Sequence, residues 1–433
     1  MKTLIAILIL SVASTVTAAG KRPGIILMMV DDMGRDRVSC YGAGHQTPHI
    51  DRLASQGVRY ETAWCTGVCT PTRVTLLTGQ YPFRHGWTRH YDVPHQGGEG
   101  LSWKKFTTVA RALRDAGYAT AVGGAWQINH PGQQPQALRE HGFDEHCVWT
   151  GVEAGRPETE QRVRNGRIMT NGRRHTAAYN PDTVNSFLID FIRRQKNGPF
   201  FVYYPLQLAG GPHATGPPNR NHPPEEKDAL YVENVTDMDQ LVGRLVAAVD
   251  TAGLRDNTLI VLTGGNSSAH AGILNDKPYR KGKGRLADQG VHVPLIVRAP
   301  FLTPGGRVSR DLVDFTDFYP TFLDLAKAER LENVILDGRS LVASLRGSED
   351  PFEKRNWIYS QRGESRMVRD WHYILDSHGN FHDLLKDPLQ QSTVSPLDKI
   401  APGRRARLQM ILDRFPKDEK APFSGIPSES DVR

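Results

Sequence analysis

Residues 24–30 read Gly-Ile-Ile-Leu-Met-Met-Val, an unbroken apolar run that ends at the polar pair Asp31-Asp32. An apolar run of this length, closed by a polar turn, is typical of a strand that is buried on both faces of a sheet. Similar runs recur at residues 199–204 and 258–263. We therefore expect three strands at the centre of one sheet.

Amphipathic patterns with helical spacing lie between and beside these runs, at residues 106–116, 183–194 and 235–254. Strands that alternate with helices over such a length favour a large α/β domain built around a mostly parallel sheet. Two irregular segments, 151–175 and 209–224, interrupt the pattern. Long irregular loops in compact domains tend to be functional, so we expect both near the mouth of a site, although 151–175 is equally well explained as a solvated surface loop.

The pattern changes at about residue 349, where short strand-like pieces precede a helical stretch near 402–414. We therefore predict a fold of class α/β over residues 20–348, followed by a small C-terminal α+β domain over 349–433.

The first residues have the order of a secretory signal. Lys2 precedes the apolar run 4–10, and the small residues 17–19 follow. The run is too short for a bilayer span, which needs about 20 residues. We expect residues 1–19 to be a cleaved signal peptide, with an uncleaved N-terminal anchor as the alternative. No later segment has the pattern of a membrane span, so the predicted location is periplasmic or secreted.

Composition excludes several classes of protein. The 433 residues carry a formal net charge of +7, with 41 Gly, 28 Pro and 4 Cys. Collagen-like, disulfide-scaffold and wholly disordered chains all need a stronger bias. The basic excess suggests anionic partners but is mild for this length, and we expect no nucleic-acid partner.

The acidic pair Asp31-Asp32 follows the leading strand. Open α/β sheets bind ligands at the carboxyl ends of their strands, where two adjacent carboxylates suit a hard divalent cation. An aspartate at a turn or at a helix N-cap is the alternative.

The stretch Cys69-Thr70-Pro71-Thr72-Arg73, followed by Val-Thr-Leu-Leu-Thr-Gly at 74–79, is more specific. It resembles the signature of the formylglycine-dependent sulfatases, C-x-P-x-R followed by Leu-Thr-Gly. The resemblance implies that a maturation enzyme oxidises Cys69 to formylglycine, whose hydrate attacks the sulfur of a sulfate ester. Independently of this, a guanidinium at Arg73 lies one helical turn beyond Cys69, where it can hold the nucleophile and balance anionic charge. The alternative for Cys69 is a buried thiol or a disulfide with Cys65.

The resemblance extends over most of the chain and implies an alkaline-phosphatase-like fold, with a large mixed β-sheet sandwiched by helices. Pro212-His213 is similar to the family's sulfate-binding Pro-His pair, and Gly282-Lys283-Gly284 to its Gly-Lys-Gly segment. The resemblance implies that His213 and Lys283 contact the sulfate and the leaving oxygen; a structural histidine and a solvated lysine are the alternatives. Asn266 is implied as a metal ligand. Structural markers of the family occur at residues 47–57, 78–86, 142–144, 317–321, 336–341 and 384–388.

Three positions depart from the family pattern. Ala125 and Gln127 stand where the family has a lysine and a histidine, and Gly265 stands where it has an acidic metal ligand. Glutamine donates hydrogen bonds but does not shuttle protons near neutral pH. Side chains that could compensate by their position are Asp276, Asp288, Lys281 and His270.

These features together predict an exported sulfatase that acts on a sulfated small molecule or polysaccharide. Its catalytic residues would be Cys69, Arg73, His213 and Lys283. One Ca²⁺ would be held by Asp31, Asp32, Asn266 and residue 69. Two alternatives are a related protein that binds sulfated glycans without turnover and a hydrolase of phosphate or phosphonate esters.

Overall fold

The computed structural model describes residues 21–91, 93, 99–151, 163–210, 227–394 and 401–416. The predicted signal peptide, residues 1–19, lies outside the described residues.

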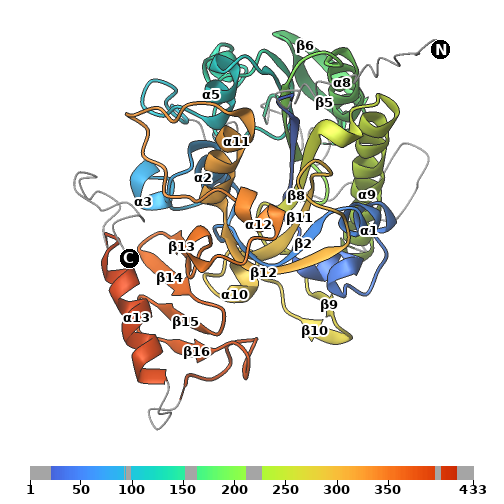
Figure 1. Ribbon diagram of the computed structural model, residues 1–433. Coiled ribbons are helices and arrows are strands. Elements are labelled where there is room, and N and C mark those ends of the chain that lie inside the picture. Colours follow the sequence, from blue (N-terminus) through green and yellow to red (C-terminus); the bar gives the residue numbers. More distant parts are fainter. Residues whose placement is uncertain are drawn as a thin grey trace, which may run out of the picture.

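A ten-stranded mixed sheet lies at the centre of the molecule, with β1 in its interior (Figure 1). Its order is β12-β2-β11-β8-β1-β7-β3-β4-β5-β6. Around β1 the neighbours β7 and β8 are parallel, whereas β11 and the β5–β6 pair run antiparallel to the strands beside them. The strands are β1 (Gly24–Val30), β2 (Val58–Trp64), β3 (Ala119–Gly124), β4 (Glu145–Trp149), β5 (Arg164–Thr170), β6 (Arg173–Tyr179), β7 (Phe200–Leu206), β8 (Thr258–Gly264), β11 (His292–Arg298) and β12 (Arg307–Asp314).

Helices cover both faces of this sheet (Figure 1). Every residue of β1 is buried, and successive side chains point to opposite faces: Leu27 enters one apolar cluster and Met28 the other. This alternation explains the unbroken apolar run, because a strand covered on both faces has no polar side. The prediction of a large mixed sheet between helices is confirmed. The Leu27 face packs on α2 (Cys69–Thr78), α5 (Val109–Asp115) and α11 (Phe318–Ala326), and the Met28 face on α1 (Pro48–Ser55), α8 (Asn180–Arg194) and α9 (Lys227–Thr251).

The segment 151–175 differs from the expected irregular loop. Residues 164–170 and 173–179 form the antiparallel hairpin β5–β6 at the edge of the sheet. The first four residues of β6 are exposed, and three of them are Arg173, Arg174 and His175. Charged residues are common on edge strands, where they prevent pairing with other chains. In β6 they replace the alternation of apolar and polar residues by which a strand is predicted from sequence.

The C-terminal part has its own four-stranded antiparallel sheet, covered by a helix (Figure 1). Leu408 and Leu412 of this helix pack with Val368 and Leu375 of the sheet. The prediction of a small C-terminal α+β domain is confirmed, and its boundary at residue 349 stays a prediction. The elements are β13 (Ile358–Arg362), β14 (Ser365–Arg369), β15 (Tyr373–Asp376), β16 (Phe381–Asp383) and α13 (Ala401–Asp413).

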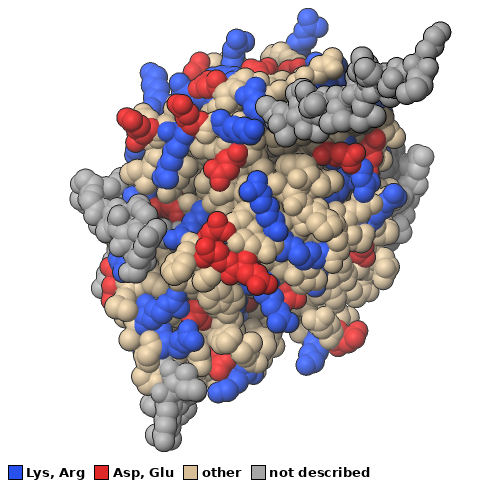
Figure 2. Space-filling model, viewed as in Figure 1, with Lys and Arg blue, Asp and Glu red and all other residues tan. Residues whose placement is uncertain are grey.

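Shorter α-helices and one small hairpin lie between these elements. They are α3 (Pro82–His85), α6 (Ala137–Glu140), α10 (Asp288–Val291), α12 (Val342–Arg346) and the small hairpin β9 (Gly272–Leu274) with β10 (Lys277–Tyr279). Within the described part of the chain, no helix combines the length and the apolar character that crossing a bilayer requires. On the face drawn in Figure 2, Lys and Arg side chains are interspersed with Asp and Glu, so neither sign of charge covers it.

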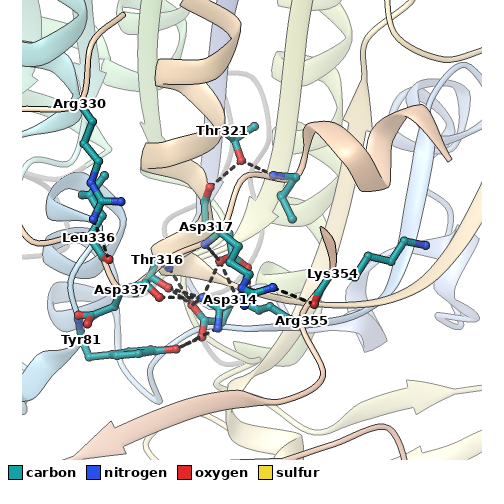
Figure 3. A network of polar contacts seen from close by, with 12 residues as sticks. Tyr81, Asp314, Thr316, Asp317, Thr321, Arg330, Leu336, Asp337, Lys354 and Arg355 are labelled. Atoms are coloured by element: carbon teal, nitrogen blue, oxygen red, sulfur yellow. Dashed lines mark hydrogen bonds and ion pairs between the residues drawn. The ribbon is translucent and has the colours of Figure 1, made fainter. Parts of the chain in front are cut away.

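A buried polar network connects the segment before β13 to the large domain (Figure 3). Arg355 donates from Nε to both carboxylate oxygens of Asp317, at 2.7 and 2.8 Å, and lies 3.6 Å from Asp314. Tyr81 donates its hydroxyl to Asp314 at 2.6 Å, and its backbone N–H bonds to Asp337 at 2.8 Å. Burial raises the pKa of Asp317, and the Arg355 guanidinium opposes that shift. Residues 78–86, 317–321 and 336–341, which resemble family markers, thus contribute to one structural junction.

Replacing Arg355 by Met is expected to lower the free energy of unfolding by about 3–5 kcal/mol, because Asp317 would remain buried without its cation. Chemical denaturation of both proteins measures this difference. Arg310, whose side chain is 89% exposed and pairs with Glu61 at 3.7 Å, provides the control. Arg310→Met is expected to change stability by less than about 1 kcal/mol. Equal effects of the two substitutions would contradict the structural role of Arg355.

Candidate active site

The carboxyl ends of β1 and β8 bring the predicted acidic pair and Asn266 to one edge of the sheet. Val30 pairs with Gly264 in parallel register, so the residues that follow each strand emerge side by side. Asp31 and Asp32 are 3% and 1% exposed, and Asn266 donates from Nδ2 to Asp32 Oδ1 at 2.7 Å. This edge is where open α/β sheets place their ligands.

Cys69 is the first residue of α2 and is 5% exposed. Burial, reinforced by the Asp31 carboxylate, raises the pKa of the Cys69 thiol to about 12, although Arg73 and Lys283 act in the opposite direction. The unmodified thiol is therefore neutral at physiological pH and a poor nucleophile, since the thiolate is the reactive form. All four cysteines are free, so Cys69 forms no disulfide with Cys65.

Arg73 lies at the centre of the site and is completely buried. Its Nη2 donates to Asp31 Oδ2 at 2.6 Å, its Nε to Gln127 Oε1 at 2.8 Å, and its Nη1 to the Tyr203 hydroxyl at 3.4 Å. Burial alone would lower the pKa of Arg73, but the groups around it, Asp31 first and then Tyr203, together raise it above its ordinary value. The guanidinium therefore keeps its charge and connects β1, β7 and the segment after β3.

Lys283 pairs with the second carboxylate. Its Nζ lies 2.8 Å from both Oδ1 and Oδ2 of Asp32, while 41% of its side chain remains exposed. Burial lowers the pKa of Lys283, but the surrounding groups, Asp32 first, together outweigh it and the net shift is upward. Lys283 is thus a protonated side chain between the buried acids and solvent.

The three positions that depart from the family pattern surround this group. Ala125 is fully buried after β3, and its backbone N–H bonds to the Pro205 carbonyl at 2.9 Å. Gln127 has a left-handed backbone, with φ 64°, and is 3% exposed. A Cβ built on Gly265 would lie 3.1 Å from both Asp31 Oδ1 and the Met29 methyl carbon, so a side chain at this position would face Asp31 and Met29.

The side chains proposed as compensation differ in their surroundings. Asp288 is occupied by Trp64, His292 and Arg369, which bond to it at 2.7–2.9 Å. Asp276 and Lys281 are exposed, Asp276 in the turn between β9 and β10. His270 stacks on Tyr231, whose hydroxyl donates to the backbone carbonyl of Asp32.

The structure brings together Asp31, Asp32, Cys69, Arg73, Asn266 and Lys283, all predicted from the sequence. His213 lies outside the described residues. Sequence reasoning missed two further members, Tyr203 and His90. His90 places Nδ1 3.5 Å from Cys69 Sγ and 3.4 Å from Thr70 Oγ1. Tyr203 falls within an apolar strand run and His90 between two helices, and neither position carries a motif that would have marked it.

The oxygen ligands at this edge of the sheet are of the kind that a hard cation prefers. They carry less negative charge than the ligand set that the family pattern implies. Asp31 and Asp32 supply carboxylates, and the buried Oδ1 of Asn266 accepts no hydrogen bond from the described residues. Within the same described residues, no three Asp, Glu, His or Cys side chains gather as a metal-ligating group. Calcium prefers six to eight oxygen ligands, and ligand charge tunes its affinity.

Comparisons with known proteins agree with this geometry. The model of the sulfatase family matches residues 23–328. Human arylsulfatase D is 26% identical over 84% of this chain and 75% of its own length. Canine N-acetylgalactosamine-6-sulfatase is 26% identical over 84% of this chain and 73% of its own.

Solved structures share the fold. Ps i-CgsB, also solved in complex with k-i-k-neocarrahexaose, superposes with a TM-score of 0.78 at 23% identity and covers 95% of this chain and 96% of its own. BT4656, solved in complex with D-glucosamine-2-N,6-O-disulfate, gives a TM-score of 0.72 at 20% identity over 91% and 97% of the two chains. Because the family model covers well over half of the sequence, the chain belongs to the sulfatase family of sulfuric ester hydrolases.

Proposed function

We propose that this protein is an exported sulfatase that hydrolyses an aryl or carbohydrate sulfate through a formylglycine formed at Cys69. The observation that carries the proposal is the position of Cys69 at the N-terminus of α2, among Asp31, Asp32, Arg73 and Lys283. The intact motif from Cys69 to Arg73 supports conversion of residue 69 by a maturation enzyme. Export rests on the signal-like residues 1–19.

The residues around position 69 have separable tasks. When present, formylglycine supplies the hydroxyl nucleophile for sulfate transfer. Lys283, partly exposed and protonated, is placed to hold the sulfate group and to stabilise charge on the departing oxygen. A cation beside an oxygen that gains negative charge during the reaction stabilises the transition state more than the ground state. Arg73 holds Asp31 and balances the charge of that carboxylate at the base of the site.

Asp31, Asp32, Asn266 and residue 69 are the proposed ligands of one Ca²⁺. The ion would supply positive charge against the sulfate oxygens. Because Gly265 provides no carboxylate, the affinity for Ca²⁺ is expected to be lower than a site with three acids would have.

The proposed substrates are sulfated sugars or aryl sulfates. Related proteins are named for aryl, steryl and N-acetylgalactosamine-6-sulfate esters, and two structural neighbours were solved with a carrageenan hexaose and a sulfated glucosamine. His213 would contact the sulfate ester from the segment 209–224.

A second candidate is a protein that binds sulfated glycans without cleaving them. Ala125, Gln127 and Gly265 favour it, because each removes a group that the family pattern assigns to sulfate, formylglycine or metal. A binding isotherm for a sulfated polysaccharide, with no sulfate released during long incubation, would select this candidate over the first.

Co-expression with a formylglycine-generating enzyme is expected to convert Cys69, because the motif from Cys69 to Arg73 is intact. Mass spectrometry of the peptide that contains residue 69 detects the loss of the thiol and the gain of an aldehyde. Cys40, Cys65 and Cys147 in the same digest serve as internal controls and should remain thiols. An unmodified Cys69 would exclude the formylglycine mechanism.

Lys283→Met is expected to lower kcat/KM for sulfate release about 100-fold or more, the usual effect of removing one charge-stabilising group. Initial rates on a chromogenic aryl sulfate measure the loss. Lys277→Met removes an exposed lysine from β10 and should leave the rate unchanged. If the two variants were equally active, Lys283 would have no part in catalysis.

Gly265→Asp is expected to tighten Ca²⁺ binding about tenfold or more, since an added carboxylate at this position faces Asp31. Titration calorimetry with CaCl₂ compares the variant with the wild type. Gly265→Asn, of nearly equal size but neutral, is the matched control and should tighten binding less. Identical affinities for all three proteins would argue against a metal site at this edge.

A further inference from the structure

A cavity of about 790 Å³ opens between α11 and α12 on one side and residues 351–357 on the other. Its lining comes entirely from residues 324–357, and none of these belongs to the group around Cys69. The volume is within the range of about 300–1,000 Å³ that small-molecule sites occupy. This cavity is therefore a separate place where a ligand fits.

The lining is predominantly basic. It contains the cations Arg330, Arg339, Arg346, Lys354 and Arg355 against the acids Asp324 and Glu353. Two of these cations are paired with carboxylates that do not line the cavity. Arg355 bonds to Asp317, and Lys354 lies 3.1 Å from Asp311.

Arg330 and Arg346 are differently placed. Both are exposed, and Arg330 directs Nη2 to the carbonyl of Leu336 at 3.4 Å (Figure 3). Among the described residues, no carboxylate lies within ion-pair distance of either guanidinium. Guanidinium groups bind planar or tetrahedral oxyanions through paired N–H donors, so these two are suited to sulfate groups.

An aromatic side chain projects beside these cations. Phe352 is 82% exposed, the largest exposure among the large apolar residues of the described chain. Its backbone is fixed, since its N–H bonds to Asp350 at 2.8 Å and its carbonyl accepts from Arg339 at 3.0 Å. An aromatic ring that is exposed to water at the rim of a cavity indicates a binding role. A ligand that covers the ring removes its apolar surface from water, which is favourable. The apolar C–H face of a sugar ring would cover it while sulfate groups meet the arginines.

We propose that this cavity is an accessory binding site for a sulfated glycan segment, distinct from the catalytic site. The choice of glycan over another anion rests on the proposed function, whose polymeric substrates would reach both sites. A second contact on the same chain raises overall affinity without any change at the catalytic site, as in other bivalent binding. The site thus gives preference to polymers over small sulfate esters.

The test measures binding to a sulfated carrageenan hexasaccharide by titration calorimetry, in a Cys69→Ala background that prevents turnover. The cavity variant adds Arg330→Gln, Arg346→Gln and Phe352→Ala. The control variant adds Arg193→Gln, Arg310→Gln and Leu385→Ala, none of which lines the cavity. The two arginine side chains are 58% and 89% exposed, and Leu385 is 67% exposed. Thermal unfolding midpoints confirm that the variants are folded, and the single variant Phe352→Ala replaces the triple one if its midpoint falls.

The expected result is a loss of at least tenfold in affinity, or of one binding event per chain, in the cavity variant alone. The desulfated hexasaccharide should bind none of the proteins at this site. Equal binding by the cavity and control variants would overturn the proposal, as would equal binding of the desulfated sugar or of poly-glutamate.

Sulfate release from a small aryl sulfate, measured separately in the Cys69 protein, keeps the two proposals apart. If no ester is cleaved but the cavity variant loses glycan binding, the accessory site stands and the sulfatase proposal fails. If the ester is cleaved and the cavity variant still binds the hexasaccharide like the control, only the accessory site fails.

Discussion

The buried ion pair between Arg73 and Asp31 is the interaction on which the arrangement of the site depends. Moving a guanidinium and a carboxylate out of water is costly, and such a pair persists only with close geometry and further hydrogen bonds. Both conditions hold here, with a 2.6 Å contact to Asp31 and additional bonds to Gln127 and Tyr203. Because Arg73 lies one turn after Cys69, this pair also fixes the N-terminus of α2 against the end of β1.

The altered positions change the charge of the site in a balanced way. By the assignment that the resemblance implies, Gly265 removes one acid and Ala125 removes one cation. In the structure, Asp31 and Asp32 face Arg73 and Lys283 in equal number. Gln127 occupies the histidine position but uses its Oε1 to accept from Arg73. The substitutions thus leave a site in which each carboxylate has a cation, consistent with a weakened metal site and a retained capacity for an anionic substrate.

The sequence predicted the central part of the fold because strands covered on both faces leave an unambiguous apolar run, as in residues 24–30. It failed at the hairpin β5–β6, where edge strands carry arginines and lose that pattern. Motifs led to the proposed catalytic residues, since Cys69, Arg73 and Lys283 lie in recognisable segments, and the structure brings these three side chains together. His90 and Tyr203 were missed because only tertiary packing brings them to Cys69 and Arg73. The cavity near Phe352 was also inaccessible to sequence reasoning, because an exposed aromatic residue is visible only in the folded chain.

In the proposed function, conversion of residue 69 to formylglycine is what makes this site a sulfatase. Its most direct test is the specific rate of sulfate release, measured by ion chromatography, in preparations that differ in the converted fraction of residue 69. We expect a rate proportional to that fraction, with a value near zero for the unconverted thiol and for Cys69→Ala. A rate independent of conversion, or no release from any aryl or carbohydrate sulfate by fully converted protein, would contradict it.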